Sequence, residues 1–200
     1  MILRLLLKML APLVEPQRLH RTSQFDSLPP AEVDVLFVGD SITQQGVWDE
    51  WFPNLKVANR GIDGNTSAQV VDRLDSLGAA AKSVFLLIGT NDLSLGVPED
   101  TIVANVDTIV AHLGSAYPGA RITVQSVMPR RRRWIARIRS LNLRLERVAA
   151  AHGASYLDLW PVLADDKGEL DRSLSLDGLH LNGAGYQRWV GVLAPVIAAR

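Results

Sequence analysis

From residue 31 onward, short apolar runs rich in β-branched residues alternate with longer segments of helical periodicity. The short runs are predicted to be strands, at 33–38, 56–59, 83–88, 121–127 and 155–159. The longer segments are predicted to be helices, at 66–77, 98–117, 134–152 and 183–199. Strands and helices that alternate along a chain build βαβ units with parallel strands. The sequence therefore predicts an α/β fold, a three-layer α/β/α sandwich around a five-stranded parallel sheet.

The chain is expected to consist of an N-terminal helical segment, 1–30, and one α/β domain, 31–200. No internal repeat, low-complexity tract or long linker interrupts the second range. With 200 residues, of which 48% are hydrophobic and 21% charged, the composition is that of a single domain with a substantial core. One compact unit is therefore the expected organisation beyond the helical segment.

Residues 1–14, MILRLLLKMLAPLV, begin like an export signal, but Arg4 and Lys8 interrupt the apolar run and no cleavage site follows closely. The stretch is also too short to span a bilayer. Two interpretations stay open: a helix packed on its own domain or on a partner, and a basic amphipathic helix in a membrane interface. We expect the cytoplasm as the compartment, with peripheral membrane contact through residues 1–14 as the alternative.

The charges of the chain balance, with 21 Lys and Arg against 21 Asp and Glu, so no overall field draws it to nucleic acid. A local exception is the run from Arg130 to Arg133, which is either solvated surface or a rim that attracts anionic substrates. The chain has no cysteine, which excludes a cysteine nucleophile, disulfides and thiolate metal sites. Catalysis therefore depends on oxygen or nitrogen groups.

Polar residues follow the predicted strands at the edge where parallel sheets place their ligand sites. They form four segments: Gly39-Asp40-Ser41, Asn59-Arg60-Gly61, Gly89-Thr90-Asn91-Asp92 and, further from its strand, Asp177-Gly178-Leu179-His180. The first segment combines a glycine that permits a tight turn with a serine hydroxyl at the start of a helix. The last segment places a carboxylate three residues before a histidine, within reach of its ring.

These residue types suit acyl transfer, which requires a nucleophile, a base and donors for an oxyanion. Ser41 is the candidate nucleophile and His180 the general base, oriented by Asp177. The candidate oxyanion donors are the side-chain amide of Asn91 and the backbone N–H groups of Gly61 and Ser41.

Each of these residues also has a simpler interpretation. Asp40 and Ser41 are common helix caps, and Asn91 and Asp92 are common in turns; for Asp92 we expect a supporting role in its loop. A metal site of Asp177 and His180 with Asp165, Asp166 or Asp171 is not expected, because no second histidine lies nearby. The remaining histidines are expected to be structural or surface residues: His20, His112 and His152.

Taken together, the four segments resemble the ordered blocks of the GDSL, or SGNH, hydrolase family, over residues 31 to about 195. Within that family, the stretch 38–63 is most similar to the platelet-activating-factor acetylhydrolase-like branch. The resemblance implies a flavodoxin-like sheet, Ser41, Asp177 and His180 as catalytic triad, and Gly61 and Asn91 beside Ser41 in the oxyanion hole. It also implies no metal or organic cofactor, and the capacity to form a homodimer.

We therefore expect a serine esterase or lipase that hydrolyses carboxylic esters through an acyl-enzyme on Ser41. Short acyl groups are expected, because no lid-sized insertion separates the four segments. Trp48 and Trp51 either shape an acyl pocket or simply pack. Two alternatives stay open: an acyltransferase that uses the same acyl-enzyme, and a non-catalytic, membrane-associated binding module of the same fold.

Overall fold

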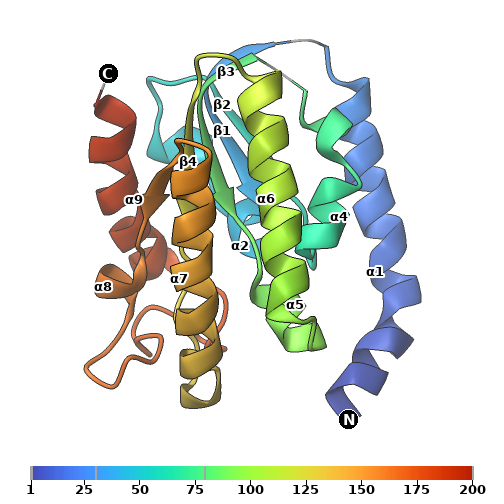
Figure 1. Ribbon diagram of the computed structural model, residues 1–200, viewed down its shortest axis with the longest axis vertical. Helices are drawn as coiled ribbons and strands as arrows, with labels where there is room; N and C mark the ends of the chain where they lie inside the picture. Colours follow the sequence, from blue (N-terminus) through green and yellow to red (C-terminus); the bar gives the residue numbers. More distant parts are fainter. Residues whose placement is uncertain (1, 30, 79, 200) are drawn as a thin grey trace.

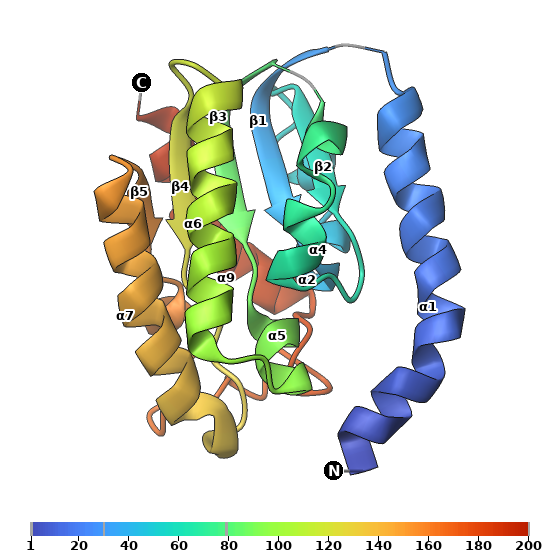
Figure 2. The ribbon, with the colours of Figure 1, turned by 45° about the vertical axis from the view of Figure 1, so that its right-hand side comes forward.

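The structure is a computed structural model that describes residues 2–29, 31–78 and 80–199, with side chains from residue 15 onward. Within these ranges, five parallel strands form one sheet in the order β2-β1-β3-β4-β5 (Figure 1 and Figure 2). The strands are β1 Glu32–Gly39, β2 Val57–Gly61, β3 Ala80–Leu87, β4 Arg121–Gln125 and β5 Ser155–Leu157. This is the flavodoxin-like order, and all the predicted strands are confirmed. Three of them end earlier than predicted: β3 by one residue, and β4 and β5 by two residues each.

Helices cover both faces of the sheet, which confirms the three-layer sandwich. One face carries α4 Ser67–Val71, η1 Leu74–Leu77, α5 Thr90–Leu95, α6 Glu99–Ala116 and α7 Ile135–Ala151. The other carries α2 Ser41–Gln44, α3 Trp48–Trp51, α8 Trp160–Leu163 and α9 Gly183–Ala198. A 3-10 turn, η2 Arg132–Trp134, leads into α7.

Two differences from the predicted helices have local causes. The predicted helix 66–77 is broken into α4 and η1, because the chain turns at Arg73 and the guanidinium of this residue points into the protein to bind backbone oxygens. Asn91 and Asp92, for which a simple turn is the alternative interpretation, lie in the first part of a short helix, α5. That helix ends at Gly96, which adopts the left-handed conformation at φ 74°.

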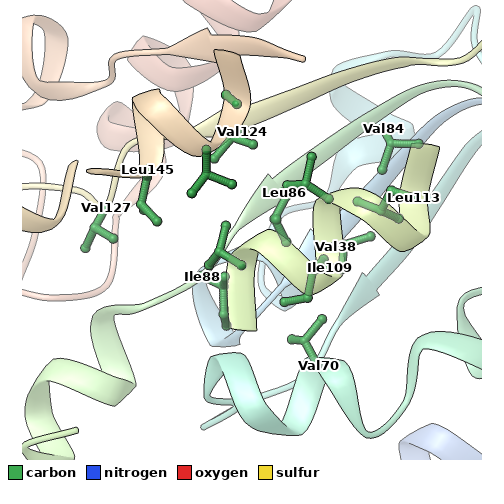
Figure 3. Packing of buried hydrophobic residues seen from close by; sticks show 14 of the residues in the cluster. Val38, Val70, Val84, Leu86, Ile88, Ile109, Leu113, Val124, Val127 and Leu145 are labelled. Atoms are coloured by element: carbon green, nitrogen blue, oxygen red, sulfur yellow. The ribbon is translucent and has the colours of Figure 1, made fainter. Parts of the chain in front are cut away.

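The core consists of two apolar layers, one on each face of the sheet. Successive residues of a strand contribute to opposite layers. Leu36 and Val38 of β1 point to the face covered by α4, α6 and α7, whereas Val35 and Phe37 point to the face covered by α9. Figure 3 shows the first layer, in which side chains from three helices meet those of the strands. The predicted stripe on α7 is buried at Ile138, Leu141, Leu145 and Val148, and Trp134 before the helix is half-buried.

The strand order reverses between β1 and β3, and ligand sites of such sheets lie at the carboxyl ends of the strands at this point. Gly39, the last residue of β1, pairs with Gly61 on one side and with Leu87 on the other. The segments that follow these three residues are therefore brought together. The fold alone places Ser41, the loop after β2 and Asn91 at one edge.

The N-terminal segment forms one helix, α1 Ile2–Ser27, which extends further than residues 1–14. Its second half packs on η1, and Phe25 is buried beneath the guanidinium of Arg60, 4.7 Å from the ring centroid. Figure 2 shows that its N-terminal end lies toward the end of the molecule at which the strands point. Across the residues that the structure describes, none of the helices combines the length and apolar character that crossing a membrane requires.

Candidate active site

Ser41 sits at a tight turn between β1 and α2. Asp40 caps α2, since its Oδ1 accepts a hydrogen bond from the N–H of Ile42 at 3.0 Å. A side chain at Gly39 would place a Cβ 2.4 Å from the carbonyl oxygen of Leu87, so only glycine fits there. Ser41 is buried, and its Oγ lies 3.0 Å from Nε2 of His180. The turn thus aims the hydroxyl at the histidine from the other end of the chain.

His180 and Asp177 belong to one turn in the loop before α9. Oδ2 of Asp177 lies 2.7 Å from Nδ1 of His180, and Oδ1 accepts the backbone N–H groups of His180 and Leu179, both at 2.8 Å. Desolvation raises the pKa of Asp177, but the hydrogen bonds from His180 and Leu179 outweigh it and hold the pKa well below its usual range. The ionised carboxylate favours a proton on Nδ1, which leaves Nε2 free to accept the proton of Ser41.

Gly61 requires a correction. Its N–H, predicted to serve an oxyanion, donates instead to Oδ1 of Asn59 at 2.9 Å. A Cβ at Gly61 would also lie 2.3 Å from the backbone nitrogen of Gln44. Glycine is therefore needed at this position for the close approach of β2 to α2, and its amide is already occupied.

Gly64, three residues later, offers the unoccupied backbone N–H that Gly61 does not. It lies in the turn after β2 at φ 72°, half-exposed, and in the described loop 61–67 its N–H alone has no hydrogen-bond partner. The other amides of this loop donate to Asn59, Gly39, Gln44, Ile62, Gln69 and Asp92. The sequence signal for this site was the Asp63-Gly64-Asn65 turn, in which glycine supplies the positive φ.

Asn91 lies beside this turn, as its Nδ2 donates to the carbonyl oxygen of Asn65 at 3.0 Å. That bond uses one of the two N–H groups of the amide and fixes the direction of the other. The N–H of Ser41, at the first position of α2, has no partner among the described residues. The N–H groups of Ser41 and Gly64 and the side-chain amide of Asn91 are thus candidate donors at this edge.

Asp92 has the supporting position expected for it. Its side chain is buried and accepts hydrogen bonds from the N–H of Ser67, at 2.9 and 3.1 Å, and from the Ser67 hydroxyl at 2.6 Å. Asn105 of α6 donates to the same hydroxyl at 2.9 Å. Burial raises the pKa of Asp92. This network ties the start of α5, which carries Asn91, to the start of α4.

Arg73 is a functional candidate that the sequence did not predict. Its guanidinium donates to Oδ1 of Asn65 at 2.7 Å and to the carbonyl oxygens of Arg60 at 2.9 Å and Gly39 at 3.2 Å. It thereby links the ends of β1 and β2 to the loop that carries Gly64. Burial lowers the pKa of Arg73 to about 10, and neighbouring arginines act in the same direction, so it keeps its charge at neutral pH.

Trp48 packs rather than lining a pocket. It is buried, its ring stacks on Phe37 with centroids 4.1 Å apart, and its indole N–H donates to the carbonyl oxygen of Thr43 at 2.9 Å. Trp51 is half-buried and packs against the same core layer. The residues described include no cluster of three or more His, Cys, Asp or Glu side chains with the geometry to hold a metal ion.

The arginine run divides into two parts. Arg130 is half-buried, with its Nη1 2.7 Å from the Ser94 hydroxyl and its guanidinium over the ring of Trp134. The next three arginines are exposed, which agrees with the interpretation of the run as solvated surface. Arg131 lies against Gly178, in the turn between Asp177 and His180. The run therefore borders the turn of Asp177 and His180 as well as the solvent.

Comparison with known proteins agrees with this geometry. The family model of the GDSL-like lipase/acylhydrolase family matches residues 37–188. Platelet-activating factor acetylhydrolase IB subunit alpha2 of Rattus norvegicus is 29% identical over 171 residues, which are 78% of this chain and 72% of that protein.

Solved structures show the same likeness. One from Streptococcus pneumonia, provisionally named a platelet activating factor, has a TM-score of 0.89 at 26% identity and covers 96% of this chain and 98% of its own. A GDSL-like lipase from Bacteroides thetaiotaomicron has a TM-score of 0.73 at 25% identity, covering 89% and 95%. Since the family model spans most of the α/β domain, the chain belongs to the GDSL-like lipase/acylhydrolase family.

Proposed function

We propose that this chain is a serine esterase that hydrolyses carboxylic esters of short acyl groups through an acyl-enzyme on Ser41. The observation that carries the proposal is the continuous chain of contacts from Ser41 Oγ to His180 Nε2, at 3.0 Å, and from His180 Nδ1 to Asp177, at 2.7 Å. This arrangement activates a hydroxyl that is otherwise a weak nucleophile. Membership of an acylhydrolase family supports the same reaction class.

In the first half of the reaction, Ser41 Oγ attacks the ester carbonyl carbon while His180 Nε2 takes the hydroxyl proton. The carbonyl oxygen becomes an oxyanion, for which the N–H groups of Ser41 and Gly64 and the amide of Asn91 are the proposed donors. Collapse of this intermediate breaks the bond to the alcohol oxygen. His180 gives its proton to that oxygen, so the alcohol leaves and the acyl group stays on Ser41.

In the second half, water attacks the acyl-enzyme and His180 accepts a proton from it. The oxyanion forms again at the same donors, and the bond to Ser41 Oγ then breaks. His180 returns the proton to Oγ, and the acid is released. An alcohol in place of water would give a new ester, so the acyl-enzyme serves transfer as well as hydrolysis.

Two observations favour a short acyl group. The mammalian relative carries acetylhydrolase in its name. In this chain, α2 and α3 are packed closely on the core, and Trp48 is buried there, stacked on Phe37, rather than lining an open pocket.

The test is hydrolysis of para-nitrophenyl esters from acetate to palmitate. We expect the highest kcat/KM for acetate or propionate, and loss of activity on the order of 10⁵-fold or more in Ser41→Ala and in His180→Ala. Matched controls are Ser115→Ala and His20→Ala, which change exposed residues outside the triad. Methanol added as a second acceptor separates transfer from hydrolysis, because only transfer yields a methyl ester.

A serine-reactive phosphonate gives a second, independent measurement. The intact protein should gain the mass of one adduct, and Ser41→Ala should gain none. A protein that forms no adduct and hydrolyses none of the esters would contradict the proposal and favour a non-catalytic binding module.

A further inference from the structure

A cavity of about 440 Å³ lies against the turn that carries Asp177 and His180. Its walls include Ser175, Leu176 and Gly178 from that turn, together with Arg131 and Arg172. The Ser175 hydroxyl accepts the N–H of Gly178 at 2.9 Å and lies 3.3 Å from Asp177 Oδ1. One wall of the cavity is thus the hydrogen-bonded turn that holds the catalytic histidine.

The cavity carries an excess of positive charge. Neither Arg131 nor Arg172 has a carboxylate within 4.0 Å among the residues that the structure describes. Glu169 is the acidic residue of the lining, so the lining holds two guanidinium groups and one carboxylate. Arg131 lies on the turn itself, because a Cβ at Gly178 would be 3.0 Å from its Nε. Unpaired guanidinium groups with free donors bind carboxylate and phosphate oxygens in bidentate fashion.

The mechanism of ester cleavage indicates which part of a bound ester would lie toward this cavity. His180 must protonate the alcohol oxygen as it leaves, so the alcohol lies on the histidine side of the ester rather than on the oxyanion side. The cavity borders the histidine turn, and none of the proposed oxyanion donors lines it. Leu176, which is 94% exposed, offers an apolar contact for the carbon skeleton of that alcohol.

We propose that this cavity is the subsite for the leaving alcohol and that the preferred substrates carry a carboxylate or phosphate on that alcohol. Arg131 and Arg172 bind the anionic group, and Leu176 contacts the carbon atoms between that group and the ester. The inference rests on the proposed esterase function and adds the chemical class of its substrate.

The test compares acetate esters that differ in charge on the alcohol side. The anionic substrates are para-acetoxybenzoate and para-acetoxyphenyl phosphate, and the neutral one is the methyl ester of para-acetoxybenzoate. The double variant Arg131→Gln/Arg172→Gln should lower kcat/KM roughly tenfold or more for the anionic esters and less than twofold for the neutral one. Each substrate is compared between wild type and variant, so differences in intrinsic reactivity cancel. The two anionic arms show whether carboxylate or phosphate is preferred.

Arg132→Gln is the matched control, since it removes an exposed arginine of the same run that does not line the cavity. It should leave all three esters within twofold of wild type. Arg172→Gln alone tests the subsite without touching the contact with Gly178, and about a threefold loss on the anionic esters is expected. Raising the salt concentration should shrink the preference, because ions screen exposed charges.

An equal effect of the double variant on anionic and neutral esters would overturn the subsite. An arginine-dependent preference for para-nitrophenyl hemisuccinate over para-nitrophenyl butyrate would overturn the assignment to the alcohol, because that charge lies on the acyl side. Absence of hydrolysis of every ester, charged or neutral, would instead overturn the esterase function on which this inference rests.

Discussion

The two halves of the candidate active site differ in how the protein holds them. Ser41, Asn65 and Asp92 are at most 3% exposed, and long-range hydrogen bonds from Ser67 and Arg73 fix the segments around them. On the other side, the side chains of Asp177 and His180 are 54% and 32% exposed. Their turn is held mainly by hydrogen bonds between residues at most three positions apart.

The difference matches what each half has to do. Donors for an oxyanion work best when they are fixed before charge develops, and a buried network provides that rigidity. The histidine side must exchange protons with an incoming ester and a departing alcohol, which requires access. Substitutions in the buried half should therefore affect both stability and rate, and those in the exposed half should affect rate alone.

The largest expected effect is the loss of activity caused by a substitution in the exposed half of the site. In Asp177→Asn, Oδ1 still accepts the N–H groups of Leu179 and His180, but the amide nitrogen cannot accept the proton on Nδ1 of His180. We expect kcat to fall roughly 10⁴-fold and Tm to change by less than about 2 °C. Ester kinetics and thermal melting check this, with the exposed Asp166→Asn as control. A loss of less than tenfold would mean that the carboxylate does not orient the imidazole.

The next largest effect is expected from a substitution in the buried half of the site. Arg73→Met leaves three oxygen acceptors without their donor, at a cost of roughly 1–3 kcal/mol each when nothing replaces it. We expect Tm to fall by about 10 °C, and kcat to fall tens-fold with little change in KM as the Gly64 turn loses its support. Arg147→Met, on the exposed side of α7, is the matched control and should change neither. An unaltered Tm in Arg73→Met would contradict the proposed positioning role.

A pH titration sharpens the comparison further. Burial raises the pKa of Asp40 from 3.8 to about 7, whereas the pKa of Asp177 is lowered. The folded state therefore binds a proton on Asp40 more tightly than the unfolded chain, and the stability this gives is present below pH 3.8 and lost as pH rises through 7.

Asp40→Asn keeps the acceptor for the Ile42 N–H and removes this titration. The free energy of unfolding of the wild type, relative to that of the variant, should decrease by at most about 1.4 kcal/mol per pH unit between these pKa values. Urea unfolding from pH 5 to 8 measures it, with the exposed Asp166→Asn as control, since Asp166 does not contribute to the pKa shift of Asp40. Parallel curves for wild type and Asp40→Asn would show that Asp40 does not titrate in this range.

The smallest expected effect is at the surface of the exposed half. Leu176→Ala should change the free energy of unfolding by less than about 0.5 kcal/mol, because the side chain is 94% exposed. Leu174→Ala, two residues away but buried, should cost roughly 2–5 kcal/mol. Chemical denaturation of both variants checks the contrast. Similar losses at the two positions would mean that the turn is anchored through Leu176 as well.

Local patterns were sufficient for most of the fold and for one half of the site. Short apolar runs rich in β-branched residues located all the strands, and the spacing of Asp177 and His180 corresponds to a turn that joins them at 2.7 Å. The oxyanion side was harder, because Gly61 ends the strand and Gly64 follows it closely, and only the hydrogen bonds show which amide is occupied. Arg73 was missed because a helical pattern does not reveal that an arginine turns inward to backbone oxygens 13 and 34 residues away.

The helix α1 shows that sequence similarity and packing draw different boundaries. The family model begins at residue 37, yet Arg21 of α1 donates to the carbonyl oxygen of Gly61 at 2.8 Å, and Phe25 fills the space beside Arg60. The division of the chain into 1–30 and 31–200 stays a prediction. A protein trimmed to residues 37–188 would lose the contact of α1 with the end of β2, so a shortened protein that is meant to preserve the site should retain this helix.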